Sequence, residues 1–261
     1  KKDILNYGMD KFTESCIARV NHFAGVQIEQ SKRLGMFMDW DNSYYTMSKT
    51  NNLYIWYFLK KCQEKGLIYK NKSATTWCPR CETGLSQHEQ AEGYQMITDT
   101  SVYLFFKLSN RDNEYVLAWT TTPWTLSANV LLAVNPELEY VKTNIDGKTV
   151  YLGADAAKRL GLYDVESIDV NKLLGEKYDS LYDFESQKGV EHKIVEWELV
   201  DAKSGSGVVH IAPGCGQEDY ELGKELGASA ISPIDSTGRF LEGYGDLTGI
   251  YAHDVSDIVI G

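Results

Sequence analysis

The chain has 261 residues, of which 43% are hydrophobic and 24% are charged, a composition that suits one large or two modest folded domains and excludes a disordered chain. Asp and Glu outnumber Lys and Arg by 37 to 26, and the net charge of −11 argues against a surface made to coat nucleic acid. No run approaches the roughly 20 apolar residues of a membrane helix, so we expect a soluble protein.

The first third of the chain has a helical pattern. Apolar residues at spacings of three and four predict a helix over residues 1–30, followed by a loop over residues 35–43. A second helix is expected over residues 50–65, ending at Gly66, with a buried face made by Leu53, Trp56, Tyr57, Leu59 and Cys62. The lysines nearby are interpreted as a solvated face rather than an RNA contact. No initiator Met precedes the helical pattern, so we expect a piece of a longer chain.

After Glu92 the sequence changes to short β-rich runs separated by turn residues. The expected strands cover residues 102–108, 115–119, 129–134, 140–143, 149–152, 193–199 and 207–212. Two short helices, 154–160 and 217–226, are each closed by a glycine. We therefore expect an α+β protein, with a mainly helical segment over 1–92, a β-rich domain over 93–261, and a boundary between Ala91 and Thr100.

The five cysteines include one closely spaced pair, Cys78 and Cys81. An odd number with isolated members argues against a secreted disulfide framework and favours the reducing cytoplasm. Two thiolates at this spacing can chelate one zinc ion, but a structural zinc site needs four ligands, and His88 is the only nearby substitute. The β-α-β context of a thioredoxin-like pair is absent. The pair is thus half of a zinc site or two unligated structural cysteines.

Four hydroxyls cluster at the end of a predicted strand. Thr120, Thr121, Thr122 and Thr125 follow the apolar run 115–118, and Pro123 restrains the turn between them. A single threonine here would be an ordinary strand residue. Four of them close to Asn129 predict a site that binds a polar ligand.

A second cluster follows the strand that contains His210. Gly214 and Gly216 lie in a loop that leads into a helix whose first turn carries Glu218 and Asp219. These acids suit the helix dipole, which is their simplest explanation. A carboxylate beside a glycine loop is also a natural partner for an ammonium group. We find no nucleophile-elbow serine, phosphate-binding loop or dinucleotide fingerprint.

Together, residues 119–125, 207–213 and 218–220 resemble the editing domain of isoleucyl-tRNA synthetases. The related valyl and leucyl enzymes carry Arg-Pro where this chain has Thr122-Pro123, which favours the isoleucyl branch. The resemblance extends through residues 33–35, 39–42, 64–70, 78–81, 85–89, 232–235 and 238–240. It implies a barrel-like, β-rich editing domain within an insertion that splits a Rossmann catalytic domain.

The resemblance implies hydrolysis of the ester in mischarged valyl-tRNA(Ile). One missing methylene allows discrimination of only about 150-fold, a value known from this same family, so a second site must remove errors. The implied catalytic residues are Thr120, Thr121, Thr122, His210 and Asp219. Asp219 would hold the substrate ammonium, and His210 would help to exclude isoleucine. Trp119, Thr125, Asn129 and Gly214 would complete the substrate site, and a positioned water would be the nucleophile.

The two ATP-binding signatures of the family, His-x-Gly-His and Lys-Met-Ser-Lys-Ser, do not occur in this sequence. The chain is therefore not expected to activate an amino acid. The resemblance implies that editing needs no cofactor and that ATP serves only the parent enzyme. A second cysteine pair of the family would complete a zinc site at Cys78 and Cys81. The implied partners are tRNA(Ile) with its mischarged 3′ end, the valyl ester and the remainder of the synthetase, with no membrane. The alternatives are a non-catalytic tRNA-binding or structural insertion, a valyl- or leucyl-type editing domain, and a metal-dependent hydrolase.

Overall fold

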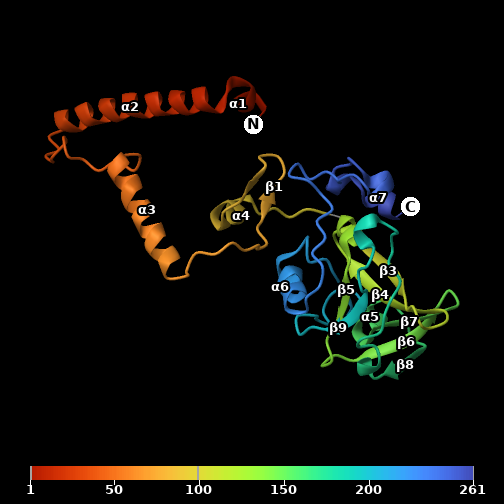
Figure 1. Ribbon diagram of the computed structural model, residues 1–261. Coiled ribbons are helices and arrows are strands. Elements are labelled where there is room, and N and C mark those ends of the chain that lie inside the picture. The colour runs from red at the N-terminus through yellow and green to blue at the C-terminus, as the bar shows by residue number, and fades with distance from the viewer. Residues whose placement is uncertain (1, 99, 261) are drawn as a thin grey trace. The chain divides into compact units, whose positions relative to one another are not determined.

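The computed structural model describes residues 2–98 and 100–260, and the chain divides into two compact units between Lys72 and Ser73 (Figure 1). Its helices are α1 (Lys2–Tyr7), α2 (Met9–Arg33), α3 (Lys49–Glu64), α4 (Gln87–Gly93), α5 (Ala154–Arg159), α6 (Gln217–Glu225) and α7 (Ser256–Ile260). Its strands are β1 (Trp77–Cys78), β2 (Thr83–Gly84), β3 (Val102–Lys107), β4 (Glu114–Thr120), β5 (Leu131–Val134), β6 (Tyr140–Ile145), β7 (Lys148–Gly153), β8 (Val165–Ile168), β9 (Lys193–Glu196) and β10 (Val209–Ile211). The predicted α+β class is confirmed.

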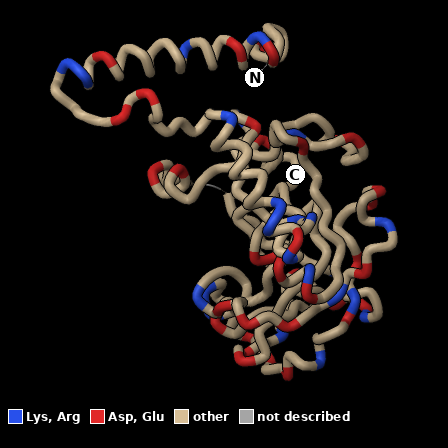
Figure 2. The backbone as a smooth tube through the Cα atoms, turned by 60° about the vertical axis from the view of Figure 1, so that its left-hand side comes forward, with Lys and Arg blue, Asp and Glu red and all other residues tan. Residues whose placement is uncertain are grey.

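The first unit is helical. The single helix expected over residues 1–30 is divided, because Gly8 adopts a φ of 102°, which ends α1 and begins α2. Acidic and basic residues alternate along α2 (Figure 2). The helix α3 starts where the Ser48 side chain accepts the Asn51 N–H, and it ends before Gly66, whose φ is 71°. The predicted glycine stop is therefore confirmed.

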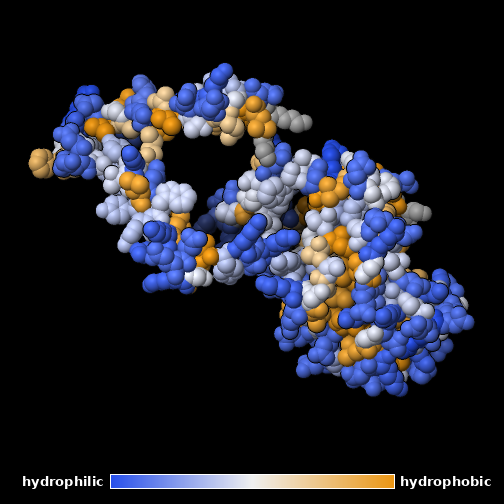
Figure 3. All heavy atoms as spheres, viewed as in Figure 1, coloured by the Kyte–Doolittle hydropathy of each residue, from blue (hydrophilic) through white to orange (hydrophobic). Residues whose placement is uncertain are grey.

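Most of the face of α3 that we expected to be buried is exposed, and its remaining members, Leu59 and Cys62, are only partly buried. Trp56 is 70% exposed and Tyr57 59%, and among the described residues none in α2 or α3 is buried. Hydrophobic side chains accordingly reach the surface of both helices (Figure 3). The prediction of burial was wrong, because helical periodicity shows which face is apolar but not what covers that face. No described helix is long and apolar enough to cross a membrane.

The division between the units lies earlier in the chain than the boundary expected between Ala91 and Thr100. Residues 73–93 belong to the second unit because they bind the segment around Ser236. Trp77 Nε1 donates to the Ser236 carbonyl at 2.8 Å, and Ser236 Oγ donates to Glu82 at 3.1 Å. These contacts join positions more than 150 residues apart, which local sequence patterns do not reveal.

The second unit contains a mixed, curled sheet with the order β8-β6-β7-β4-β10-β5-β9, and β3 pairs with β4 (Figure 1). Every predicted strand is present, whereas β8 in this sheet and the two-residue strands β1 and β2 outside it were not predicted. The strand β10 lies between β4 and β5, parallel to β4 with Val209 opposite Trp119, and antiparallel to β5 with His210 opposite Leu132. This topology places the residues after β4 beside those of β10.

The core around this sheet is apolar, and its largest fully buried side chains include Tyr140, Phe106 and Leu132. One cluster of buried residues packs around Phe106 and Val116, and another packs around Leu131 and Ile211. Burial of such side chains stabilises the fold by roughly 1.5–3 kcal/mol each. The sheet is therefore a rigid base for the loops at its edge.

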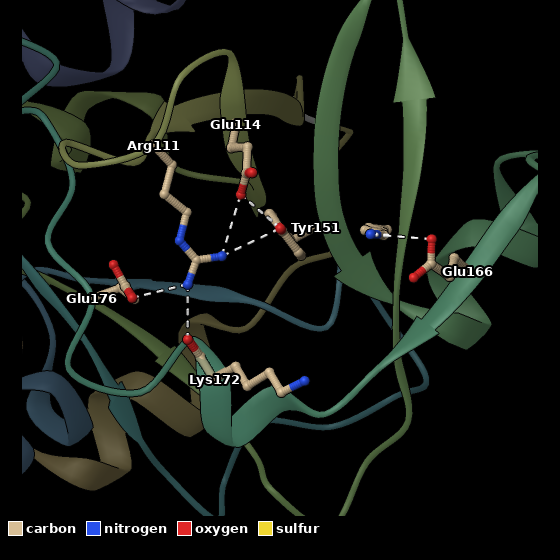
Figure 4. Close-up of polar contacts among 7 residues, drawn as sticks. Arg111, Glu114, Tyr151, Glu166, Lys172 and Glu176 are labelled. Carbon is tan, nitrogen blue, oxygen red and sulfur yellow. Dashed lines mark hydrogen bonds and ion pairs between the residues drawn. The ribbon is translucent and has the colours of Figure 1, made fainter.

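Arg111 joins three segments of this domain (Figure 4). Its guanidinium donates to Glu114 at 3.2 Å, to Glu176 at 2.9 Å and to the Lys172 carbonyl at 3.0 Å. Tyr151 on β7 also donates to Glu114, at 2.7 Å. The two carboxylates hold the pKa of Arg111 above its usual value, against the opposing effect of burial. This network anchors the start of β4, whose other end carries the threonine cluster.

Candidate active site

The threonines at the end of β4 form a chain of hydroxyls. Thr120 Oγ1 accepts the backbone N–H of Thr122 at 3.1 Å, and it lies 3.3 Å from Thr122 Oγ1. Thr122 Oγ1 in turn lies 3.4 Å from Thr125 Oγ1. Pro123 starts the 3-10 helix Pro123–Ala128, and this turn brings Thr125 back toward Thr122. Thr120 and Thr125 are buried, whereas Thr121 and Thr122 are exposed. The exposed pair is therefore available to a ligand.

His210 closes this chain of hydroxyls. Its Nε2 lies 2.9 Å from Thr125 Oγ1, a contact made possible by the pairing of β10 with β4. His210 is 8% exposed, and its Nδ1 has no hydrogen-bond partner among the described residues. Burial lowers the pKa of His210 to about 4, so the imidazole is neutral at pH 7.

Asp219 lies just beyond the end of β10. It is the third residue of α6, and its Oδ1 accepts the N–H of Ala212, two residues after His210, at 3.4 Å. Burial raises the pKa of Asp219 to about 6. The carboxylate is half-buried, and with this pKa it is mainly ionised at pH 7, so an ammonium group would complement it.

Two glycines allow the 212–216 loop to approach its neighbours closely. A Cβ on Gly214 would collide with the Ile231 carbonyl, and a Cβ on Gly216 would collide with Asp219 Oδ2. Cys215 lies between them, and burial, assisted by the Asp219 charge, raises the pKa of its thiol to about 12. This thiol is protonated at pH 7 and is therefore a poor nucleophile.

Asn129 is used differently from what we expected. Its Nδ2 donates to the Leu131 carbonyl at 3.0 Å, and its Oδ1 accepts the Tyr178 hydroxyl at 2.7 Å. The side chain is 3% exposed. Its role in substrate binding stays a prediction, but in this structure the amide joins β5 to Tyr178 within the core.

A groove of about 610 Å³ extends from these motifs across the second unit. Trp124 of the threonine motif and Gly214 of the glycine loop line one part of it. Trp77, Asp235 and Tyr251 line another part. Neither Trp124 nor Tyr251 was predicted to be a site residue. Only its position within the threonine motif could have indicated that Trp124 lines the site.

Trp119, which was expected to bind substrate, is half-buried, and its ring centroid lies 6.5 Å from that of Tyr103.

Cys78 is the last residue of β1, and Cys81 lies in the turn that connects β1 to β2. The backbone N–H of Cys81 donates to Cys78 Sγ at 3.4 Å, and this bond lowers the pKa of the Cys78 thiol. The turn thus favours the thiolate form of Cys78, which is the form in which a cysteine binds a metal. However, the described residues contain no cluster of three or more His, Cys, Asp or Glu side chains that could hold a metal, so His88 does not complete a site here. The zinc site stays a prediction.

Comparison with known families defines the class of protein to which this fold and site belong. A family model described as tRNA synthetases class I (I, L, M and V) matches residues 1–204, so the chain belongs to the class I tRNA synthetase family.

Among curated proteins, the chain is similar to isoleucine–tRNA ligases. The ligase of Thermococcus kodakarensis is 36% identical over 97% of this chain and 25% of its own length. That of Thermoplasma acidophilum is 34% identical over 100% and 26%, and that of Clostridium novyi is 35% identical over 96% and 24%. The chain therefore spans about a quarter of the length of these relatives.

Two solved structures show partial similarity. The crystal structure of GlLeuRS-CP1 matches 49% of this chain and 58% of its own, with a TM-score of 0.41 and 18% identity. The Plasmodium knowlesi cytosolic leucyl-tRNA synthetase editing domain matches 49% and 62%, with a TM-score of 0.39 and 12% identity.

Proposed function

We propose that the second unit hydrolyses the aminoacyl ester of valyl-tRNA(Ile) within an isoleucine–tRNA ligase. The observation that carries this proposal is the convergence of three groups at one edge of the sheet. They are exposed threonine hydroxyls, a neutral buried His210, and the half-buried carboxylate of Asp219. The sequence similarity to isoleucine–tRNA ligases supports the choice of substrate.

Each group has a part in substrate binding. Asp219 receives the ammonium of the valyl group, because a charge-assisted hydrogen bond forms most readily with an ionised, partly desolvated carboxylate. The hydroxyls of Thr121 and Thr122 are exposed and bind the ester and the terminal ribose. The His210 ring bounds the space for the amino-acid side chain. The aromatic groove at Trp124 and Tyr251 suits the adjoining nucleoside, since rings stack on bases.

The reaction needs no covalent intermediate. The half-buried Cys215 thiol is protonated at pH 7 and is a poor nucleophile, and in this proposal water takes that role. Water oxygen attacks the ester carbonyl, the bond from the carbonyl carbon to the ribose oxygen breaks, and that oxygen leaves with a proton as a free hydroxyl. Valine and tRNA(Ile) are released. The hydroxyls and the carboxylate contribute by positioning, because they hold the ester in place before the attack.

The test is deacylation of purified valyl-tRNA(Ile) and isoleucyl-tRNA(Ile) by the full-length synthetase that carries this chain. The unmodified enzyme should hydrolyse the valyl ester and spare the isoleucyl ester. The substitution His210→Ala should let the larger side chain enter, so that isoleucyl-tRNA is hydrolysed too, because only contact can exclude one methylene. Absence of valyl-tRNA hydrolysis would instead favour a non-catalytic insertion, and loss of activity with chelator would favour a metal-dependent hydrolase.

A further inference from the structure

The 3-10 helix Pro123–Ala128 ends on a buried carbonyl that the helix itself does not pair. In a 3-10 helix, the carbonyl of Ser127 would accept the N–H of the residue three positions later. The chain leads into β5 at this point, however, and the Val130 N–H donates instead to the Ile211 carbonyl of β10 at 2.9 Å. Ser127 is 1% exposed, so bulk water does not supply the missing donor. The carbonyl therefore needs a donor from elsewhere in the fold.

Gln187 supplies that donor from 60 residues further along the chain. Its Nε2 donates to the Ser127 carbonyl at 2.9 Å. The orientation of the amide is fixed by chemistry, because only the nitrogen of a glutamine side chain can donate to a carbonyl. Gln187 is 7% exposed, and its Oε1 has no hydrogen-bond partner among the described residues. Since an apolar side chain would fill this space without the cost of an unpaired oxygen, the bond to Ser127 accounts for the amide.

The segment that carries Gln187 is held against the same part of the fold. Gln187 ends a second 3-10 helix, Glu185–Gln187, which Phe184 precedes. The ring centroid of Phe184 lies 5.1 Å from that of Tyr244, in an apolar cluster against which Trp124 also packs. This cluster and Gln187 thus hold the 3-10 helix 123–128 near its start and at its end.

We propose that Gln187 is a positioning residue for ester hydrolysis, which fixes the 3-10 helix 123–128 and thereby the Thr122 hydroxyl that precedes it. This inference rests on the proposed function and deepens it, since Thr122 is one of the hydroxyls assigned to the ester and the ribose. The Thr122 carbonyl accepts the Thr125 N–H at 3.0 Å, so the first turn of the helix holds Thr122 in place. Without Gln187 the Ser127 carbonyl is left unpaired, and the helix shifts to reach another donor, which displaces Thr122.

The hold on the helix is measurable without any activity. Hydrogen–deuterium exchange of the full-length synthetase, read by mass spectrometry on peptides that cover residues 123–130, reports local opening of the helix. Gln187→Met keeps the length of the side chain and removes the donor, whereas Gln187→Asn keeps the amide but falls one methylene short of Ser127. Both variants should exchange about tenfold faster in this segment, as expected when a buried carbonyl loses its donor. If Gln187→Met does not fold, as judged by aminoacylation, Gln187→Asn carries the same test.

Asn135→Leu is the matched control. Asn135 is also a buried amide whose Nδ2 donates to backbone carbonyls, those of Val200 at 3.0 Å and Glu198 at 3.2 Å, but it follows the end of β5 that is remote from the 3-10 helix. This variant should lower the melting temperature at least as much as Gln187→Met, and it should leave the exchange of residues 123–130 and the hydrolysis rate unchanged. Equally fast exchange of residues 123–130 in Asn135→Leu would show general loosening and overturn the specific role of Gln187.

Single-turnover hydrolysis of valyl-tRNA(Ile) tests the consequence. In both Gln187 variants, the displaced hydroxyl should lower the rate constant at saturating enzyme by about tenfold to a hundredfold. A smaller folded fraction would raise only the enzyme concentration that gives half of the maximal rate, so that result alone, or unchanged exchange of residues 123–130, would overturn the proposal. If exchange rises as expected but the unmodified enzyme hydrolyses no valyl-tRNA(Ile), Gln187 still holds the helix, and it is the proposed function that fails.

Discussion

The substitution Asp219→Asn tests the charge of the Asp219 carboxylate while keeping its contact with the neighbouring loop. Asparagine keeps an oxygen at the Oδ1 position, so the bond from the Ala212 N–H can persist. It removes the negative charge that would hold the substrate ammonium. Asp219→Ala removes both the charge and the loop contact, so a comparison of the two variants shows how much of any loss comes from the loop.

The expected loss follows from the partly buried position of the carboxylate. Removal of one partner of a desolvated, hydrogen-bonded charge pair costs on the order of 2–5 kcal/mol. Since about 1.4 kcal/mol corresponds to a factor of ten, hydrolysis of valyl-tRNA(Ile) should slow by about 30-fold to a few thousandfold.

The raised pKa of Asp219 also predicts the pH dependence. With a pKa of about 6, the carboxyl becomes protonated as the pH falls through that value, and hydrolysis should decline there. In Asp219→Asn this inflection should disappear, because no titrating group remains at that position.

The assay is single-turnover hydrolysis of valyl-tRNA(Ile) by the full-length enzyme, with aminoacylation measured first to detect misfolding. Glu218→Gln is the control, because Glu218 is an exposed acid in the same turn of α6. It should change the rate by less than about twofold, as expected for an exposed charge at a helix end. Acetylation of the substrate amine should mimic Asp219→Asn. Normal hydrolysis by Asp219→Asn, or of the acetylated substrate, would refute ammonium binding by this carboxylate.

Three further predictions concern stability and metal content. His192 is buried with both ring nitrogens lacking a hydrogen-bond partner among the described residues, and burial lowers its pKa. As the pH falls, His192 is therefore protonated in the unfolded chain before it is protonated in the folded chain. The unfolding free energy should then fall as the pH drops below about 6.5, and in urea titrations His192→Phe should weaken that decline. Arg111→Met should lower the unfolding free energy by about 2–4 kcal/mol, because it removes the positive charge that faces two half-buried carboxylates. Lys188→Met, which removes an exposed ion pair, should cost less than about 1 kcal/mol. Elemental analysis of the purified chain should find less than one zinc per molecule, abolished by Cys78→Ser, and one zinc that survives chelator would contradict the half-site interpretation.

Local sequence patterns determined most of the secondary structure. The strands β3 to β7, β9 and β10, the two glycine-closed helices α5 and α6, and the end of α3 before Gly66 all follow from periodicity and turn residues over short windows. Such patterns report backbone preferences and side-chain spacing, which act between residues close in sequence. The strand β8 escaped prediction because three of its four residues are exposed, so it lacks a clear alternation of buried and exposed positions.

The sequence also indicated which residue types gather at the candidate site, but only the tertiary structure decided how they are used. Thr125 and His210 are 85 residues apart, and they meet because β10 pairs with β4. Asn129 matched the pattern of a binding residue, yet its amide is bonded to Leu131 and Tyr178. Contacts of this kind depend on strand order and on burial. Neither is encoded in a short stretch of residues, because both arise only when distant segments pack together.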